Sequence, residues 1–389
     1  MKILLVFTFN TSLKIWHEQG ILNRELKVYR DLVDNFGYKI TLLTYGNKSD
    51  INILKEYELE DYFEILPIYS NTNKSNFKII NIFKSIKYTL KIYRNNNYFD
   101  IVKTNQLYGS WVAIFYKLLT KNKLIIRTGY NSVAFAKFEN KSKIKILLFT
   151  LLSKISLIFC DLYVTTNKDD INLITKNKSL QKKIIYQPNF VDIAERDVKQ
   201  IEQREFNTLF SVGRLEEQKN HTKLIEMLKN SKYKLRIVGE GKLRDTLIEL
   251  SKKYNIELEL SSNLDHDLLL ETYSEYLFYI QLSKFEGNPK TILEAMGAGC
   301  VVITTNVYGI KNIIKHEENG ILIKANDDLS LIIDNLLLDN GLINKISTNV
   351  DDDITSSDFI SVTTEYSVLN FSPISVIAST TSFSGMNPD

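Results

Sequence analysis

Short apolar runs alternate along this chain with longer stretches in which apolar residues recur at helical spacing. The runs lie at residues 2–7, 39–44, 101–103, 123–126 and 162–165. The same alternation restarts after Asp192. Strands that alternate with helices are typical of parallel sheets. We therefore expect an α/β fold with two Rossmann-like domains that face a central cleft, with ligands bound outside the carboxyl ends of the strands.

Length and composition favour a soluble globular protein of two domains. The chain has 389 residues, 44% of them hydrophobic and 24% charged, which is too long for one typical core. We predict domains at 1–187 and 188–345. The apolar run at 2–7 is too short for a secretion signal and lacks a small-residue cleavage site. Cys160 and Cys300 lie among apolar neighbours, so we expect reduced thiols and a cytoplasmic protein. Four scattered histidines predict no metal site.

Charge is divided unevenly between the two halves. Residues 1–190 contain 29 Lys and Arg against 15 Asp and Glu, whereas the remainder contains 20 against 31. A basic half with interleaved aromatic residues favours an anionic partner, here the inner surface of a membrane or a lipid diphosphate. The sequence carries no recognised nucleic-acid motif, so nucleic acid is not predicted. Segment 144–159 is too short and too polar to span a bilayer. It either packs only on the sheet or also touches membrane.

The last 44 residues differ in composition from the rest. Segment 346–389 contains no Lys or Arg and has 16 Ser and Thr. We predict an atypical tail that is replaced or frame-shifted and poorly packed or disordered.

Two carboxylates eight residues apart, Glu286 and Glu294, mark the strongest candidate site. Between them, Gly287 permits a turn, Asn288 is a capping residue type and Pro289 suits the first helical position, so a helix is predicted to begin near Pro289. Its first N–H groups favour an anion such as a diphosphate, and the acids suit sugar hydroxyls. A bare pair of glutamates is also compatible with ordinary solvated residues.

Cations lie upstream at the ends of predicted strands. The run 207–212 leads into Gly213 and Arg214, with Lys219 five residues later. Two fixed cations at one loop end suit a diphosphate, including one that departs as a leaving group. A second strand-to-helix turn follows at Gly239, which alone is a weak signal.

Together these segments resemble the donor domain of the group 1, family 4, retaining glycosyltransferases. The resemblance rests on FSVGRLEEQKN (210–220), IVGEGKL (237–243) and the 286–294 segment, and covers about residues 205–325. YQPNFVD (186–192) is similar to the junction before the family's second domain, and 320–322 to one of its strands. Segment 12–25 is similar to the first loop and helix of some bacterial members. The resemblance implies the GT-B fold.

The resemblance also implies roles for matching residues. Arg214 and Lys219 would bind the diphosphate, Glu294 the ribose, and Glu286 the transferred sugar as a positioning residue, so that Glu286, Arg214 and Lys219 act at the reacting centre. The implied donor-binding set is Gly213, Arg214, Lys219, Gly239, Glu286, Gly287, Asn288, Pro289, Lys290, Thr291 and Glu294. Base recognition would use the backbone near 261–264. No metal or other cofactor is implied.

The acceptor side matches the family less well. Its candidates are His17, Gly20 in the first loop, and Arg127 after the strand at 123–126; ordinary structural roles are open for His17 and Arg127. The implied function is retaining sugar transfer from a nucleotide diphosphate sugar to a hydroxyl of a lipid-linked saccharide, in bacterial surface polysaccharide synthesis. A nucleotide-sugar epimerase of the same fold, and a donor-binding protein without turnover, are the alternatives.

Overall fold

The N-terminal half forms one parallel sheet. The computed structural model describes residues 1–189 and 199–349. The first sheet has seven strands in the order β3-β2-β1-β4-β5-β6-β7, and its neighbours all pair in parallel. The strands are β1 (Lys2–Val6), β2 (Lys39–Thr44), β3 (Phe63–Pro67), β4 (Ile101–Thr104), β5 (Lys123–Thr128), β6 (Leu162–Thr165) and β7 (Ile184–Tyr186).

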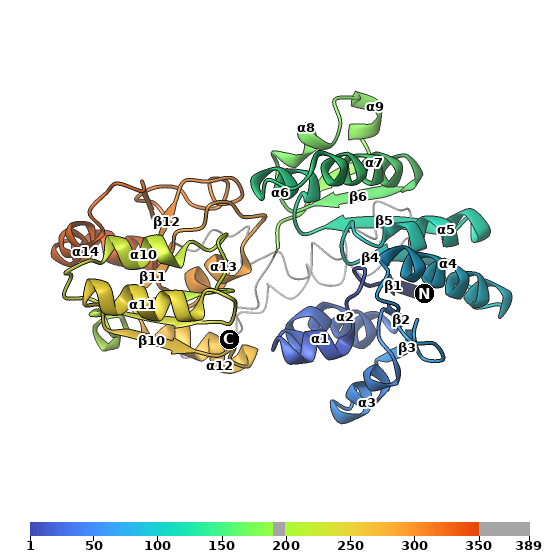
Figure 1. Cartoon of the computed structure of the whole chain (residues 1–389), viewed down its shortest axis with the longest axis horizontal. Helices are drawn as coiled ribbons and strands as arrows, with labels where there is room; N and C mark the ends of the chain where they lie inside the picture. Colours follow the sequence, from blue (N-terminus) through green and yellow to red (C-terminus); the bar gives the residue numbers. More distant parts are fainter. Residues whose placement is uncertain (190–198, 350–389) are drawn as a thin grey trace, which may run out of the picture.

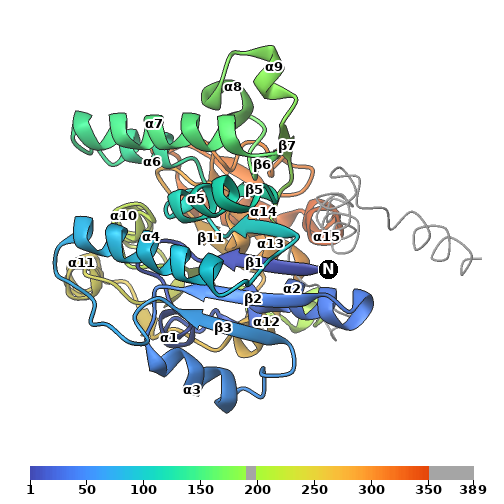
Figure 2. The same cartoon turned by 90° about the vertical axis from the view of Figure 1, so that its right-hand side faces the viewer.

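Helices cover both faces of this sheet (Figures 1 and 2). Helices α1 (Leu13–Glu18), α2 (Leu22–Phe36) and α3 (Lys48–Glu56) share a core with Ile3 and Leu5 of β1. The other core, built on Leu4 and Val6, receives α4 (Lys78–Arg94), α5 (Ser110–Thr120) and α7 (Lys143–Phe159). Alternate residues of β1 thus pack into the cores on opposite faces of the sheet. The remaining helices here are α6 (Ser132–Phe138), α8 (Asp170–Ile174) and α9 (Lys178–Gln181).

The C-terminal half repeats this architecture. Its six-stranded sheet has the order β10-β9-β8-β11-β12-β13, again with parallel pairing. The strands are β8 (Thr208–Val212), β9 (Lys234–Val238), β10 (Leu258–Ser261), β11 (Phe278–Gln281), β12 (Val301–Thr305) and β13 (Ile321–Ile323). The helices are η1 (Ile201–Gln203), α10 (His221–Met227), α11 (Arg244–Tyr254), α12 (His266–Glu275), α13 (Lys290–Gly297), α14 (Leu329–Leu338) and α15 (Asn340–Thr348). Two hydrophobic cores flank the sheet.

The predicted α/β class and the two Rossmann-like halves are confirmed, whereas the two edge strands of the first sheet were not predicted. β3 and β7 lie at opposite edges of the first sheet. An exposed Glu64 interrupts the apolar pattern of β3, and β7 has only three residues. Edge strands lack the two-sided burial that produces a continuous apolar run, which explains why they escaped prediction.

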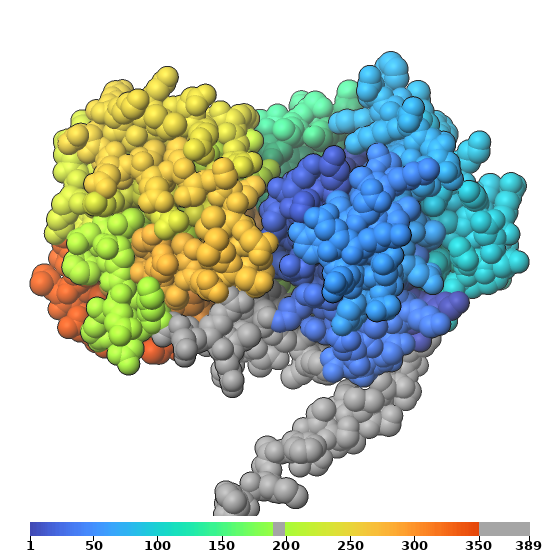
Figure 3. Space-filling model, turned by 90° about the horizontal axis from the view of Figure 1, so that it is seen from below, coloured from blue at the N-terminus to red at the C-terminus, as the bar shows by residue number. Residues whose placement is uncertain are grey.

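The C-terminal boundary predicted at 345 falls inside a helix. α15 continues to Thr348, and Ile346 is buried with Ile343 in the domain core. Ile343 and Ile346 are spaced three residues apart, so both lie on the buried face of α15. The helix therefore continues beyond residue 345, where Lys and Arg cease in the sequence. The remainder of the predicted tail, from 350 onward, lies outside the described residues. Figure 3 shows the N-terminal surface, in blue, directly against the yellow and orange surface of the C-terminal half.

Candidate functional site

A pocket of about 490 Å³ lies between the two domains, within the size range of small-molecule sites. The loops after β8 and β11 supply its C-terminal wall, so the pocket lies at carboxyl ends of strands, as expected for this class of fold. The C-terminal lining residues are Arg214, Gln218, Lys219, Glu286, Gly287, Asn288, Pro289, Lys290 and Thr291. The N-terminal domain contributes Arg24, Gly129, Tyr130, Ser132, Phe135, Ala136, Glu139, Lys141, Lys145 and Phe149.

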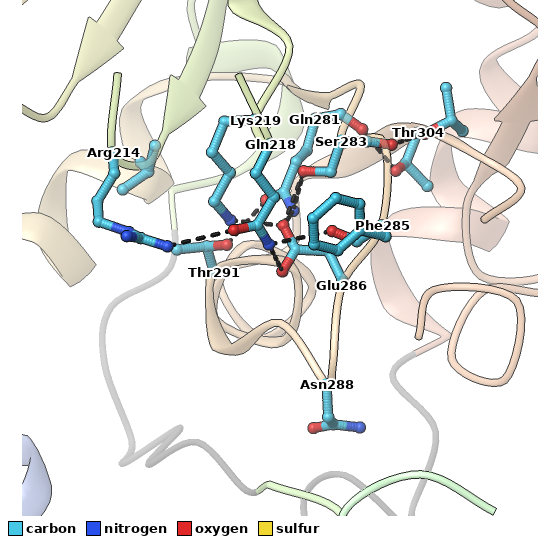
Figure 4. Close-up of polar contacts among 12 residues, drawn as sticks. Arg214, Gln218, Lys219, Gln281, Ser283, Phe285, Glu286, Asn288, Thr291 and Thr304 are labelled. Atoms are coloured by element: carbon cyan, nitrogen blue, oxygen red, sulfur yellow. Dashed lines mark hydrogen bonds and ion pairs between the residues drawn. The ribbon is translucent and has the colours of Figure 1, made fainter. Parts of the chain in front are cut away.

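Glu286 is the centre of a buried hydrogen-bond cluster on the pocket wall. Its side chain Oε1 accepts from Lys219 Nζ at 2.7 Å, Ser283 Oγ at 2.7 Å and Gln281 Nε2 at 3.0 Å. Oε2 accepts from Gln218 Nε2 at 3.4 Å. Figure 4 shows these groups converging on the carboxylate. Glu286 is 6% exposed, and burial strengthens these hydrogen bonds. Of the two carboxylate oxygens, Oε2 has the greater capacity to accept a hydrogen bond from another donor.

Arg214 extends the same wall toward solvent. It is exposed, and its Nη2 donates to Gln218 Oε1 at 3.2 Å. Gln218 therefore links Arg214 to Glu286 through its two amide atoms (Figure 4). The sequence-predicted cations Arg214 and Lys219 both face this pocket, where together they favour an anionic group.

The loop that carries Arg214 depends on two glycines in close approach. A Cβ at Gly239, where φ is 153°, would collide with the carbonyl oxygen of Gly213. Neither residue appears among the pocket-lining residues. The two predicted glycines therefore shape the backbone behind Arg214 instead of meeting the pocket themselves.

Helix α13 begins one residue later than its sequence pattern predicts. Pro289 is the N-cap and Lys290 the first helical residue. Asn288 does not cap the helix, which corrects the sequence-based interpretation. Its side-chain Oδ1 instead accepts from the backbone N–H of Asn189 at 3.0 Å, and its carbonyl accepts from Asn189 Nδ2 at 2.7 Å. Figure 4 shows Asn288 pointing away from the Glu286 cluster. Asn288 therefore contacts the junction between the domains and does not cap α13.

The other residues around this helix start serve the domain interface and the Glu286 cluster. A Cβ at Gly287 would lie 2.7 Å from the carbonyl oxygen of Gly129 in the N-terminal domain. Thr291 Oγ1 donates to Gln281 Oε1 at 2.8 Å, which orients the amide that donates to Glu286.

Lys290 pairs with the N-terminal domain. Its Nζ lies 2.8 Å from Glu25 Oε1 on α2. Burial acts to raise the pKa of Glu25, but Lys290 and Arg24 outweigh it and hold that pKa at about 2. Sequence reasoning placed Glu25 in the resemblance but gave it no role, because its partner is 265 residues away.

Glu294 lies apart from the Glu286 cluster. It is 1% exposed and does not line the pocket. Its Oε1 accepts from Arg24 Nη1 at 3.2 Å, and its Oε2 accepts from Tyr273 Oη at 3.3 Å. Arg24, to which the sequence gave no role, lines the pocket. It donates a hydrogen bond to the carboxylate that was predicted to bind ribose. Segment 12–25 includes Arg24 in the family resemblance, but the sequence gives it no role, since its partner lies in the other domain.

The three predicted acceptor-side residues do not form one group. His17 is exposed, and its Nδ1 lies 2.9 Å from Oη of Tyr57, the residue that follows α3, outside the pocket lining. Gly20 lies against the C-terminal domain, where an added Cβ would be 3.0 Å from the carbonyl oxygen of Leu264. Arg127 lies within β5, which continues to Thr128, and its Nη2 donates to Asn189 Oδ1 at 3.1 Å.

Further contacts join the domains beside the pocket. Tyr308 Oη donates to Asp170 Oδ1, and burial raises the pKa of Asp170. The ring of Phe285 stacks on Phe138 of α6 with centroids 4.9 Å apart. Among residues 1–189 and 199–349, no three His, Cys, Asp or Glu side chains are grouped as metal ligands.

Sequence comparison connects the C-terminal half with a known family. The sequence model described as "Glycosyl transferases group 1" matches residues 192–352. A Campylobacter jejuni protein named N-acetylgalactosamine-N,N'-diacetylbacillosaminyl-diphospho-undecaprenol 4-alpha-N-acetylgalactosaminyltransferase is 28% identical over 57% of this chain and 62% of its own length. An uncharacterized glycosyltransferase from Methanocaldococcus jannaschii is 32% identical over 37% of this chain and 39% of its own. The chain thus spans less than two thirds of these relatives.

Structural comparison covers both halves. Sucrose-phosphate synthase from Thermosynechococcus elongatus superposes with a TM-score of 0.74 over 95% of this chain and 99% of its own, at 16% identity. At this identity the likeness establishes the fold, which is GT-B.

Proposed function

We propose that the chain, which has the GT-B fold and matches the group 1 glycosyl transferases over residues 192–352, transfers a sugar from a nucleotide diphosphate sugar to a hydroxyl of a saccharide acceptor. The observation that carries the proposal is the contact between Lys219 and Glu286 on the pocket wall, with Arg214 beside it. A cation for phosphate and an acid for sugar hydroxyls then lie side by side, as the two ends of a sugar diphosphate require.

Arg214 and Lys219 stabilise the diphosphate in this proposal. The bond between the anomeric carbon and the diphosphate oxygen breaks, and negative charge grows on the departing phosphate. Fixed cations are most effective where charge develops during a reaction. The first N–H groups of α13 add a favourable dipole, and Lys290 and Thr291 lie at that helix start. The proposal assigns charge neutralisation to these groups and includes no metal or other cofactor.

Glu286 positions the transferred sugar in this proposal. Three donors already occupy Oε1, whereas among the residues that the structure describes Oε2 accepts only the longer bond from Gln218. A sugar hydroxyl would donate to Oε2. The acceptor oxygen forms the new bond on the face that the diphosphate leaves, and its proton passes to the departing phosphate. The anomeric configuration is retained, and no protein nucleophile is needed.

The proposed acceptor is a lipid-linked saccharide at the inner face of the bacterial membrane, in surface polysaccharide synthesis. Two observations support it. The Campylobacter jejuni relative is named for a diphospho-undecaprenol substrate, and the N-terminal half carries the basic excess of the chain. Lys141 and Lys145 bring part of that excess to the pocket, where cations favour an acceptor with phosphate groups.

The test is incubation of the purified chain with a panel of nucleotide sugars and undecaprenyl-diphosphate-linked saccharides. We expect nucleoside diphosphate release that depends on acceptor, together with a product whose anomeric configuration by NMR matches the donor. An isomerised nucleotide sugar would instead identify an epimerase, and tight donor binding without product would identify a binding protein. An inverted product would overturn the proposed retention alone.

A further inference from the structure

Helix α7 exposes a stripe of apolar residues, although two serines lie on its buried face. That face carries Ser153 and Ser156 beside Leu157. Ser156 Oγ is 2.9 Å from Ser110 Oγ of α5, and Ser153 Oγ is 3.4 Å from Tyr163 Oη of β6. The solvent face carries Ile144, Leu147, Leu148, Leu151 and Ile158, from 52% to 73% exposed. Their spacing follows one helical stripe. Five large apolar side chains on one exposed stripe are not expected for a helix face that meets only water.

Helix α4 also combines buried polar residues with exposed apolar ones. Asn81, Ser85 and Thr89 lie on its buried face at intervals of four residues, together with Ile92. Ser85 Oγ accepts from Trp111 Nε1 of α5 at 3.2 Å, and Thr89 Oγ1 donates to the Ser85 carbonyl at 2.8 Å. The residues exposed on the α4 N-terminal half and just before it are Phe77, Ile79, Ile80 and Phe83. Two helices with this pattern in one layer indicate a surface with an apolar partner.

The two helices flank α5 on the same side of the sheet. Both pack against α5, and Figure 2 shows α7, α5 and α4 in succession. Aromatic contacts cross the layer: Tyr108 lies edge-on to Phe149 of α7 at 5.6 Å and to Trp111 of α5 at 5.4 Å between centroids. We call this surface the α4–α7 face. Its exposed apolar residues are Phe77, Ile79, Ile80, Phe83, Ile144, Leu147, Leu148, Leu151 and Ile158.

Charge identifies the kind of partner. Residues 65–160, which include both helices, contain 16 Lys and Arg but only two acids, Asp100 and Glu139. Exposed Lys143 and Lys154 lie on α7, and exposed Lys87 and Lys91 lie on α4. An apolar stripe flanked by lysines is the pattern of a helix that lies in the interface of an anionic bilayer. No helix in residues 1–189 and 199–349 has the length and apolar character needed to cross a membrane.

We propose that the α4–α7 face docks the protein on an anionic lipid bilayer. Its apolar side chains enter the region below the headgroups, and the flanking lysines contact lipid phosphates. Lys145 and Phe149 belong to α7 and also line the pocket. Docking therefore brings the pocket to the membrane interface. Membrane docking adds to the proposed function by placing the pocket near a lipid-linked acceptor. It rests on the proposed function only in assuming that the acceptor is lipid-linked.

Flotation with vesicles tests the surface directly. We expect the full chain to bind vesicles of phosphatidylcholine with phosphatidylglycerol, and to bind pure phosphatidylcholine far less. Leu148→Ser with Leu151→Ser should lower partition about tenfold or more, because two apolar side chains lose their burial. Lys143→Gln and Lys154→Gln should lower it about fivefold for each lysine, and added salt should have a similar effect.

Matched controls use the other domain. Leu331 and Leu338 of α14 are 55% and 86% exposed, so Leu331→Ser with Leu338→Ser makes the same chemical change away from the α4–α7 face and should leave partition unchanged. Unfolding temperatures establish that each variant is folded. Equal vesicle binding by the α7 and α14 variants would overturn the proposal.

Light scattering and donor binding separate the remaining outcomes. A wild-type dimer that becomes monomeric in the α7 leucine variant, without vesicle binding by either, would assign the face to a second copy and overturn membrane docking. Vesicle binding without sugar transfer would overturn the proposed function but leave the docking surface standing. Unchanged donor affinity in the α7 variants would support a role for the face outside the donor site.

Discussion

Arg24 Nη1 lies 3.2 Å from Glu294 Oε1, although the two residues are 270 positions apart and belong to different domains. The Arg24 guanidinium donates to the carboxylate of Glu294, which is 1% exposed. Arg24 itself lines the pocket. Because Glu294 is buried and does not line the pocket, a ribose hydroxyl can reach it only if covering groups such as Arg24 move. Donor binding to Glu294 would therefore be coupled to the contact between the two domains.

Glu294→Ala tests whether this acid holds the donor. If ribose hydroxyls replace Arg24, the substitution should weaken nucleoside diphosphate binding by about 1 to 3 kcal/mol. Isothermal titration calorimetry measures the change. Glu271→Ala, at an exposed position on the neighbouring helix α12, is the control and should bind normally. A lower unfolding temperature with unchanged nucleotide affinity would reduce Glu294 to a structural partner of Arg24.

The sequence could predict a common location for the proposed donor-side residues because they lie close together along the chain. Gly213, Arg214 and Lys219 follow one strand, and Glu286 to Thr291 follow another, so parallel pairing of β8 with β11 brings both loops to one sheet edge. Arg24 gave no such signal. Its position depends on how two separate sheets meet, and no periodicity within either sheet encodes that arrangement.

Lys219→Ala should slow sugar transfer more than it weakens donor binding. Its Nζ lies 2.7 Å from Glu286 Oε1, and both side chains are largely buried. If Lys219 stabilises the departing diphosphate, its loss should lower kcat by about 10²- to 10³-fold. The matched control is Lys284→Ala, because Lys284 pairs with Glu217 at 2.9 Å on an exposed surface, where ion pairs contribute little. Equal kcat values for the two variants would remove Lys219 from the reaction.

Gly239→Ala should disturb the backbone behind Arg214. The new Cβ would collide with the Gly213 carbonyl oxygen, so we expect a lower unfolding temperature and weaker nucleotide binding. Gly37 is the control, because it has φ of 63° with no atom within 4 Å of an added Cβ. Gly37→Ala should cost only about 1 kcal/mol of stability and leave nucleotide affinity unchanged. Normal nucleotide affinity in Gly239→Ala would argue against a role for this close approach.

The orientation of helix α7 could not be predicted from its sequence. The pattern of α7 predicted a helix that packs on the sheet or also touches membrane, and the two were not separable from composition. The buried positions of Ser153 and Ser156 show which side of the helix faces the sheet. Their partners, Ser110 and Tyr163, lie in other elements. Such tertiary hydrogen bonds satisfy the two serines on a buried face that they share with Leu157.

The pair formed by Glu25 and Lys290 should make stability depend on pH. Burial alone would raise the pKa of Glu25, but Lys290 and Arg24 hold it at about 2, below its ordinary value of 4.5. The ionised carboxylate thus favours the folded chain fully above about pH 4.5, and this contribution, at most about 3 kcal/mol, is lost as the pH falls toward about 2. Glu25→Gln should therefore lower the free energy of unfolding near neutral pH, and the difference from wild type should shrink as the pH falls.

Urea unfolding of wild type and Glu25→Gln between about pH 7 and about pH 3 measures that difference. Glu18→Gln is the control: Glu18 lies 3.7 Å from Lys14 Nζ with both side chains more than half exposed, so its loss should change stability little at any pH. A constant difference between Glu25→Gln and wild type across this range would show that the carboxylate charge does not stabilise the fold. Because the Glu25–Lys290 pair joins the domains, a difference that does shrink would mean that acid weakens the contact between the two domains.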